Sequence, residues 1–317
     1  MPVVEISDKT LDEGAHLLRA GQLVAFPTET VYGLGADATN GAAVAAIYAA
    51  KGRPQFNPLI AHVADTEAAK RHVELAGKAA KLAQAFWPGP LTLVLPRVAD
   101  CKISELVTAG LDTVAIRVPS HPIARDLLRR ADVPVAAPSA NMSGRVSPTT
   151  AAHVAHDLRT KVAMILDGGP TEHGLESTIV AVEGDSVIIL RPGALTAAQI
   201  EGVTGGPVRR SYDAGERPRS PGQLESHYAP HAAVRLEATS IGAGEALLAF
   251  GPNPPFTVGP MFNLSSKGNL VEAAANLFAA LRTLDQPHIN CIAVTHIPNA
   301  GLGEAINDRL KRAAKGR

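Results

Sequence analysis

The first polar stretch that could do chemistry is FPTETVYGLG at residues 26–35, which follows the apolar residues 23–26. It places two hydroxyls, a carboxylate and a phenol beside two glycines, which let a backbone come close to a ligand. The same residues could instead form a capped turn in which Thr28 and Thr30 bond only to the backbone. On this stretch alone, a ligand site and a structural turn are equally well supported.

The second stretch is KGRPQFNPL at residues 51–59. Pro54 and Pro58 cannot continue the helix that is expected to end at Lys51, so a rigid loop holds Lys51, Arg53 and the amide of Asn57. Such a loop suits a polyphosphate, because arginine binds it with a forked set of hydrogen bonds and lysine with a point charge. A solvated charge pair that interacts with the helix dipole is the alternative.

The third stretch, PVAAPSANMSG at residues 134–144, follows an apolar strand, where open α/β sheets place their ligands. Ser139 and Asn141 offer neutral hydrogen bonds there. Arg117 lies on the preceding apolar strand, and Arg191 ends the last strand of the first domain. A buried arginine needs an anionic partner, which is either the carboxylate or phosphate of a ligand or a structural aspartate.

Other candidate residues favour ordinary structural roles. His62 lies inside an apolar strand, which is typical of a core histidine, although it could face the same cleft. His153 and His156 lack further ligands for a metal, and no metal site is expected. The sequence contains no GxSxG elbow, P-loop or HExxH motif, and Gly301-Leu302-Gly303 does not complete a GxGxxG motif. Covalent catalysis and dinucleotide binding are therefore not expected.

The hydrophobic pattern predicts an α/β protein, because apolar strands alternate with Ala-rich segments of helical period. Helices are expected around residues 11–18 and over 42–51. Strands are expected over residues 23–26, 59–63, 91–95, 114–118, 133–136, 162–166, 177–182 and 187–190. Because these strands are too many for one βαβ unit, we expect one large mixed sheet with helices on its faces.

The composition and hydrophobic periodicity of the sequence change after Arg191-Pro192-Gly193. A mixture of Pro, Gly and Arg that fits neither periodicity predicts a linker over 202–230, between a first domain at 1–201 and a small α/β domain at 231–317. In the small domain, strands are expected over residues 246–250 and 292–295, and helices over 269–283 and 304–314.

Composition narrows the class of protein. The 317 residues include 30 Lys plus Arg and 30 Asp plus Glu, so binding to nucleic acid through bulk charge is not expected, although a local basic cleft is compatible with this balance. The two cysteines are expected to be ordinary reduced thiols. With no apolar run long enough to cross a bilayer and no signal-peptide pattern, we expect a cytoplasmic protein without membrane contact.

The three stretches, in this order, resemble the YrdC-like family, the threonylcarbamoyl-AMP synthases. SPGQLESHYAP at 220–230 and GLGEAINDRLKRAA at 301–314 resemble its long, two-domain form. The resemblance implies a twisted, mixed-sheet YrdC-like catalytic domain, a linker with a lid role, and a small Rossmann-like accessory domain.

The family reaction joins L-threonine, bicarbonate and ATP into L-threonylcarbamoyl-AMP and releases pyrophosphate. The product supplies the group that is attached to the adenosine beside the anticodon of tRNAs. The resemblance thus implies ATP as a substrate and Mg²⁺ carried by its phosphates. It also implies weak or transient RNA contact, and docking to the transferase machinery that uses the adenylate.

The family motifs also assign roles to individual residues. The L-threonine side is assigned to Thr30, His62, Arg117, Ala137 and Ser177. The ATP side is assigned to Lys51, Arg53, Asn57, Thr113, Ser139, Asn141, Ser147, Arg191, His227 and Tyr228. Lys51, Arg53, Ser139 and Asn141 are expected to be catalytic.

One departure concerns the linker. Archaeal members typically read SPGMKYRHYAP, whereas residues 223–226 are Gln-Leu-Glu-Ser in this chain, so neutralisation of phosphate by the linker rests on fewer groups. Two alternatives to the synthase are a double-stranded-RNA-binding or ribosome-associated module and a carbamoyl transferase. The balanced charge and the absence of RNP-like aromatic residues disfavour RNA binding. The zinc-finger and acylphosphatase modules that accompany the transferases are not in this chain.

Overall fold

The larger of two sheets is mixed, as expected. The computed structural model describes residues 3–212, 218–223 and 226–316. Within them, the large sheet has the strand order β1-β8-β2-β3-β7-β4-β6-β5-β9-β10-β11. Neighbouring strands are parallel in some pairs, such as β4 with β6, and antiparallel in others, such as β2 with β3. The strands are β1 Val3–Glu5, β2 Val24–Phe26, β3 Gly33–Asp37, β4 Ile60–His62, β5 Leu91–Pro96, β6 Thr113–Arg117, β7 Val135–Ala136, β8 Met164–Asp167, β9 Thr178–Glu183, β10 Ser186–Arg191 and β11 Arg209–Arg210.

Helices cover both faces of the first half of this sheet. Alternate side chains of a strand point to opposite faces, so Val24 and Phe26 pack with α1 and α6, whereas Leu23 and Ala25 share a core with α2, α4, α5, α7 and α8. The helices are α1 Asp8–Arg19, α2 Gly41–Lys51, α3 Thr66–Lys70, α4 Gly77–Phe86, α5 Glu105–Thr108, α6 Pro122–Ala131, α7 Ala151–Leu158 and α8 Ala197–Thr204.

The second half of the sheet has one face that carries strand residues alone. Ile60, Ala115, Ile179 and Ile188 are among the members of this apolar cluster, and no helical residue of the described chain belongs to it. The members of this cluster are buried, and one of them, Ile60, lines the cavity described below.

The eight strands predicted in the first domain are all present, each within two residues of its expected bounds. The structure adds strands that the pattern did not predict. β3 lies within and beyond FPTETVYGLG, where a turn was considered, because small residues such as Gly33 and Gly35 do not show the alternation of a strand. β11 pairs in parallel with β10, and α8 extends to Thr204, so the start of the segment at 202–230 belongs to the large sheet and its cover. The absence of a periodic pattern did not mean an absence of regular structure there.

The second sheet is small and wholly parallel, in the order β12-β15-β13-β14. Its strands are β12 Ala233–Arg235, β13 Glu245–Ala249, β14 Met261–Asn263 and β15 Cys291–Val294, and its helices are α9 Leu270–Leu284 and α10 Gly303–Ala314. The sequence predicted both helices and the two buried strands. It missed β12 and β14, which are three residues long, lie at the edges of the sheet and are partly exposed.

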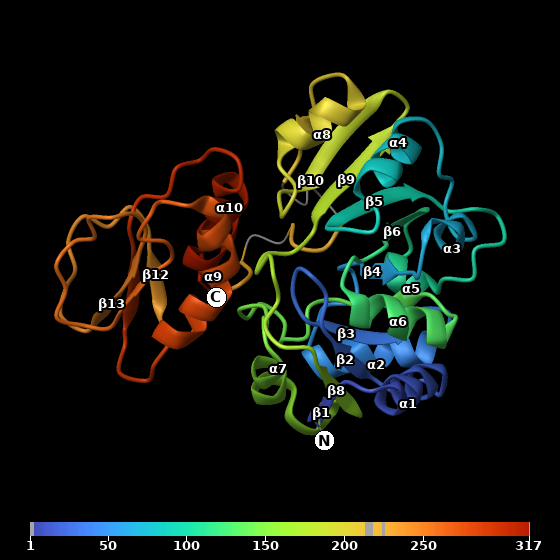
Figure 1. Ribbon diagram of the computed structural model, residues 1–317, viewed down its shortest axis with the longest axis horizontal. Helices are drawn as coiled ribbons and strands as arrows, with labels where there is room; N and C mark the ends of the chain where they lie inside the picture. The colour runs from blue at the N-terminus through green and yellow to red at the C-terminus, as the bar shows by residue number, and fades with distance from the viewer. Residues whose placement is uncertain (1–2, 213–217, 224–225, 317) are drawn as a thin grey trace.

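The two helices of the small domain face the large one. α9 and α10 lie between the small sheet and the first domain (Figure 1). Gly303 begins α10 so close to the carbonyl oxygen of Pro298 that a Cβ atom would lie 1.8 Å from it. The glycines of Gly301-Leu302-Gly303 therefore shape the turn into a helix, as the sequence indicated.

Neither helix of the small domain, nor any other helix among the described residues, is long and apolar enough to span a membrane.

Candidate active site

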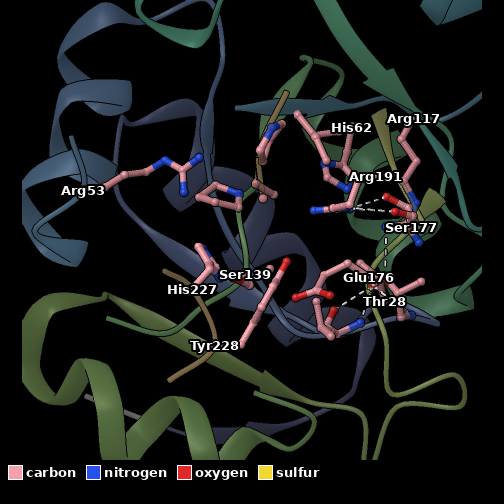
Figure 2. Close-up of a pocket in the computed structure, with 18 residues that line it drawn as sticks. Thr28, Arg53, His62, Arg117, Ser139, Glu176, Ser177, Arg191, His227 and Tyr228 are labelled. Carbon is pink, nitrogen blue, oxygen red and sulfur yellow. Dashed lines mark hydrogen bonds between the residues drawn. The ribbon is translucent and has the colours of Figure 1, made fainter. Parts of the chain in front are cut away.

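A small cavity gathers residues from all three polar stretches and from the linker. Its volume is about 40 Å³. All five residues assigned to L-threonine line it, together with Arg53, Ser139, Arg191, His227 and Tyr228 from the nucleotide side. Figure 2 shows Arg53 on one side of the cavity and Arg117, Arg191 and Ser177 on the other. The remaining lining residues are Thr28, Val31, Gly33, Ile60, Pro138, Glu176, Pro221 and Gly222.

The loop from α2 to β4 presents Arg53 to this cavity. α2 ends at Lys51, as expected, because Gly52 adopts a left-handed conformation with φ of 61° and Pro54 follows it. The Arg53 guanidinium donates to the carbonyl oxygens of Asn57, at 3.2 Å, and Pro58, at 2.9 Å. It is buried, and no carboxylate of the described residues pairs with it. Burial lowers its pKa to about 10, so it stays charged at neutral pH.

Arg117, at the end of β6, is held by the first polar stretch. Its Nη2 lies 2.5 Å from Oε1 of Glu29, and its Nη1 donates to the hydroxyl of Thr30 at 3.0 Å. Glu29 also accepts a hydrogen bond from the backbone N–H of Ser120 at 3.1 Å. Burial raises the pKa of Glu29, but Arg117 and these hydrogen bonds outweigh it, so the pKa lies below its ordinary value. The buried arginine thus has a structural carboxylate, a glutamate rather than an aspartate.

The two readings of FPTETVYGLG both describe part of the structure. The Thr28 hydroxyl donates to the carbonyl oxygen of Val31 at 2.7 Å, which is the capped turn. The Thr30 hydroxyl bonds instead to side chains, Thr28 at 2.9 Å and Arg117, and Thr30 lines the cavity.

Arg191, at the end of β10, contacts Ser177 and no carboxylate of the described residues. Its Nη2 donates to the carbonyl oxygen of Ser177 at 2.8 Å and to the hydroxyl at 3.1 Å, while Thr92 bonds to the same hydroxyl at 2.7 Å. Burial lowers the pKa of Arg191. Gly222 lies against this side chain with φ of 88°, and a Cβ atom there would lie 2.7 Å from Cδ of Arg191. The linker therefore crosses Arg191 at a point where only glycine fits.

Two buried histidines add neutral rings to the cavity wall. His62 on β4 is paired in register with Arg117 on β6, and its ring packs edge-on against Phe26. His227 packs edge-on against Tyr228, with ring centroids 4.1 Å apart. Burial, reinforced by nearby arginines, lowers the pKa of each imidazole to about 3. In both rings Nδ1 is buried and has no hydrogen-bond partner among the described residues, so each ring has an unused polar atom.

Glu176 is a lining residue that the sequence analysis missed. Its Oε1 accepts a hydrogen bond from the hydroxyl of Ser147 at 2.6 Å, and its Oε2 accepts one from Nε of Arg309 at 2.8 Å. Burial raises its pKa, but Arg309 and Arg191 reverse the shift and lower the pKa to about 2. The carboxylate of Glu29 was noted in the first polar stretch, but its pairing with Arg117 was not predicted. A single acid at the edge of a strand is not a recognisable pattern, because its partner lies far away in the sequence.

Five residues assigned to the nucleotide do not line this cavity: Lys51, Asn57, Thr113, Asn141 and Ser147. Three of them support residues that do. Lys51 donates to backbone carbonyls of the 139–141 loop, Asn57 accepts from Arg53 through its carbonyl oxygen, and Ser147 bonds to Glu176. Asn141 donates to the carbonyl oxygens of Met142 and Arg145. Thr113 begins β6, at the opposite end from Arg117.

A larger groove of about 1300 Å³ lies between α7 and the end of α9. None of the residues singled out in the sequence as ligand contacts lines it. The described residues also contain no group of three or more His, Cys, Asp or Glu side chains that could hold a metal ion. The smaller cavity, with its buried guanidinium groups, is therefore the candidate active site.

Comparison with known proteins identifies the family. One family model, described as "telomere recombination", matches residues 16–193, and a second, "threonylcarbamoyl-AMP synthase, C-terminal domain", matches residues 195–315. A threonylcarbamoyl-AMP synthase of Bacillus subtilis is 44% identical, over 98% of this chain and 94% of its own length. One of Pyrococcus abyssi is 41% identical, over 95% of this chain and 92% of its own length. The chain belongs to the threonylcarbamoyl-AMP synthase family. It is thus an enzyme of the long, two-domain form, and the RNA-binding alternative is not favoured.

The fold of this chain is similar to that of a relative whose structure has been solved. The P. abyssi Sua5 protein complexed with L-threonine superposes with a TM-score of 0.91 at 36% identity, over 99% of this chain and 98% of that one. A variant of the same protein, in which an adjacent histidine and tyrosine are replaced by alanine, gives a TM-score of 0.88, over 99% of this chain and 97% of that one. The likeness extends over both domains of the threonylcarbamoyl-AMP synthase fold.

Proposed function

We propose that this chain joins L-threonine, bicarbonate and ATP into L-threonylcarbamoyl-AMP, with release of pyrophosphate, for modification of the tRNA adenosine beside the anticodon. One observation carries the proposal for the site. Three buried guanidinium groups line one cavity, and two of them, Arg53 and Arg191, pair with no carboxylate of the described residues. Because burying an unpaired charge costs several kcal/mol, such groups favour an anionic ligand. The triphosphate of ATP and the carboxylate of threonine are anions of this kind.

The proposed reaction requires the protein to align its two substrates and does not require a nucleophilic side chain. The threonine amine and bicarbonate condense to a carbamate with loss of water. An oxygen of this carbamate forms a bond to the α-phosphorus of ATP, and the bond to the departing pyrophosphate breaks in line with it. Such a step gains most from holding the two anions together and from neutralising charge, which arginine does with directed hydrogen bonds.

We assign the threonine side to the end of the cavity at Arg117. Thr30 bonds to Arg117, His62 lies beside it on the neighbouring strand, and Ser177 and Ala137 complete the wall. The relative of known structure from P. abyssi is complexed with L-threonine, which supports a threonine site in this fold. The neutral rings and hydroxyls would satisfy the polar groups of a small amino acid without adding charge.

We assign the phosphates to Arg53 and Arg191, which lie on opposite sides of the cavity. Ser139 lies between these two arginines (Figure 2). Lys51 supports this side by donating to carbonyl oxygens of the 139–141 loop, and Asn57 supports it through its carbonyl oxygen, which accepts from Arg53. Asn141, Ser147 and Thr113 remain assigned to ATP on the family motifs. Tyr228 and His227 contribute from the linker.

The linker acts as a lid in this proposal. The cavity of about 40 Å³ holds roughly three water molecules, whereas small-molecule sites typically have about 300–1,000 Å³. Pro221, Gly222, His227 and Tyr228 of the linker take part in lining it. ATP can therefore enter only when these residues withdraw. Of the sequence departure at 223–226, Leu224 and Glu225 lie outside the described residues, whereas Gln223 accepts hydrogen bonds from the N–H groups of Arg219 and Ser220.

We propose that Mg²⁺ reaches the site on the phosphates of ATP. Glu176 is the one carboxylate among the described lining residues, and both of its oxygens already accept hydrogen bonds. The lining therefore offers no free carboxylate oxygen to Mg²⁺, which prefers oxygen ligands in an octahedral arrangement, and this supports its arrival with ATP.

The division proposed from sequence is a catalytic domain at 1–201, a linker at 202–230 and an accessory domain at 231–317. α8 and β11 extend the large sheet and its cover into the start of this linker. The docking of this chain to the transferase machinery stays a proposal based on the family.

The proposed reaction is tested by pyrophosphate release from the purified full chain with ATP and Mg²⁺. We expect release to need both L-threonine and bicarbonate. Equal turnover without threonine would contradict the proposal, and equal turnover in bicarbonate-depleted buffer would contradict the carbamate step.

A further inference from the structure

Arg309 on α10 reaches out of the small domain into the wall of the candidate active site. Its side chain is fully buried. Nε lies 2.8 Å from Oε2 of Glu176, and Nη2 lies 2.9 Å from the carbonyl oxygen of Pro192, which are both residues of the first domain. Nη1 pairs with Asp308 at 2.7 Å. One guanidinium therefore joins α10 to the residue segment that precedes β9 and to the one that follows β10.

The same guanidinium also holds the linker. Its carbon lies 5.0 Å from the ring centroid of Tyr228, within range of a cation–π interaction. The ring also stacks on Phe278 of α9, at a centroid distance of 5.5 Å and an angle of 25°. Tyr228 has φ of 63°, which costs a non-glycine residue free energy and persists only where the surroundings fix it. Arg309 and Phe278 of the accessory domain supply those surroundings.

Arg309 also compensates the negative charge of Glu176. Glu176 lines the cavity beside the guanidinium groups that we assign to the phosphates, and it holds Ser147 through its other oxygen. As long as Arg309 pairs with it, the carboxylate is compensated. Without Arg309, a buried negative charge would face the triphosphate and repel it.

We propose that Arg309 is a positioning residue through which the accessory domain prepares the nucleotide side of the active site: it neutralises Glu176 and fixes Tyr228. The proposal rests on the function assigned above. A threonylcarbamoyl-AMP synthase of Vibrio vulnificus matches 50% of this chain over 86% of its own length. The family name is thus also borne by a protein that matches only half of this chain, and the role of Arg309 belongs to the two-domain form.

The test is a charge rescue in the full chain. Arg309→Met is expected to raise the KM for ATP at least about tenfold, since an uncompensated charge near the phosphates acts in a medium of low dielectric constant. The KM for threonine should change less than about threefold. Adding Glu176→Gln to Arg309→Met removes the charge and should bring the KM for ATP back to within about threefold of the wild-type value.

A pH profile separates this effect from loss of structure. In Arg309→Met, Glu176 loses its ion pair but keeps Ser147, Arg191 and His227 nearby, so its pKa rises from the lowered wild-type value. Its protonation at lower pH then removes the repulsion, and the KM for ATP should fall. The wild-type chain should not show this change. An Arg309→Met variant with the wild-type KM for ATP, or a double variant no better than Arg309→Met, would overturn the proposal.

Lys311→Met is the matched control, because Lys311 lies on the same helix, carries the same charge and is exposed. We expect its KM for ATP to stay within about twofold of the wild-type value, and an increase equal to that of Arg309→Met would overturn the proposal. If Arg309→Met does not fold, Arg309→Lys gives the measurement. Lysine cannot bond to Glu176 and Pro192 and cover Tyr228 at once, so the KM for ATP should rise about threefold or more; an unchanged value would overturn the proposal.

Two measurements keep this inference distinct from the proposed function. Threonine- and bicarbonate-dependent pyrophosphate release by the wild-type chain tests the function. Calorimetric binding of a non-hydrolysable ATP analogue to the wild-type chain and to Arg309→Met tests the inference even where no turnover occurs. A weaker affinity of the variant supports it, whereas equal affinities, or no binding to either protein, overturn it.

Discussion

The ammonium nitrogen of Lys51 lies 2.5 Å from the main-chain carbonyl oxygen of Ser139, and it also donates to the carbonyl oxygen of Asn141. These bonds join the end of α2 to the loop that follows β7. Lys51 is buried and forms no ion pair among the described residues, so burial, reinforced by Arg53, lowers its pKa well below the ordinary value. The second and third polar stretches, at 51–59 and 134–144, are thus joined directly through Lys51.

Replacing Lys51 with methionine is expected to lower kcat/KM for ATP at least about tenfold, since two hydrogen bonds of a charged donor, each worth roughly 1.5–3 kcal/mol, position the Ser139 loop. The loss of stability should be smaller, because the substitution also removes the cost of burying an ammonium group. Pyrophosphate release and thermal unfolding measure the two effects. Lys161→Met, which removes an exposed donor to the carbonyl oxygen of Ala50, is the control. Turnover like that of the wild-type chain in Lys51→Met would contradict this role.

Arg53→Ala and Arg191→Ala should each lower kcat/KM for ATP by about tenfold or more, because each removes a charge-assisted contact to phosphate. The effect should appear mainly in ATP titrations of pyrophosphate release, with less change in threonine titrations. Arg129→Ala on α6 removes a half-exposed arginine outside the cavity wall and should leave turnover unchanged. If the Arg53 and Arg191 variants behave like Arg129→Ala, the phosphate assignment is wrong.

Glu29→Gln should destabilise the chain by about 3–5 kcal/mol, because it leaves the guanidinium of Arg117 buried without its negative partner. Urea unfolding followed by circular dichroism measures the loss. The double variant Glu29→Gln/Arg117→Met should be more stable than Glu29→Gln, since neither charge is then buried alone. A loss below about 1 kcal/mol in Glu29→Gln would mean that the pair is not the determinant of this part of the core.

Stability should fall as the pH drops from 7 to 5. The folded chain keeps His62 and His227 neutral to about pH 3 and His153 to about pH 4, whereas their unfolded pKa is near 6.5. Below pH 6.5 the unfolded state therefore binds more protons, and unfolding becomes easier, by up to about 1.4 kcal/mol per pH unit for a fully buried histidine. Glu29 and Glu176, with lowered pKa values, extend the loss below about pH 4.5.

Thermal unfolding between pH 7 and 5 measures this dependence. His62→Asn should flatten the curve by about one bound proton. His156→Asn, which replaces an exposed histidine, is the comparison variant. A melting temperature that is independent of pH over this range would contradict the expected state of the buried histidines.

The sequence predicted the elements that show a clear period and missed those that do not. Buried strands such as β5 and β6 were found within a residue or two, because uninterrupted apolar residues distinguish them from their surroundings. β3, with two glycines, and β11, with two arginines, carry no such pattern, and only pairing with a neighbouring strand makes them strands. A strand forms its hydrogen bonds with neighbouring strands, which can lie far away in the sequence and therefore leave no trace in the local hydrophobic pattern.

The sequence by itself determined the family motifs, the α/β class and the side chains that line the cavity at Thr30, Arg53, Arg117 and Arg191, since chemistry and spacing are properties of the chain. The tertiary structure decided which arginines are paired. Glu29 neutralises Arg117, and Glu176 pairs with Arg309 from the other domain, while Arg53 and Arg191 keep no carboxylate among the described residues. Ion pairs depend on distances of a few ångströms between residues far apart in the sequence, and only the folded chain brings them that close.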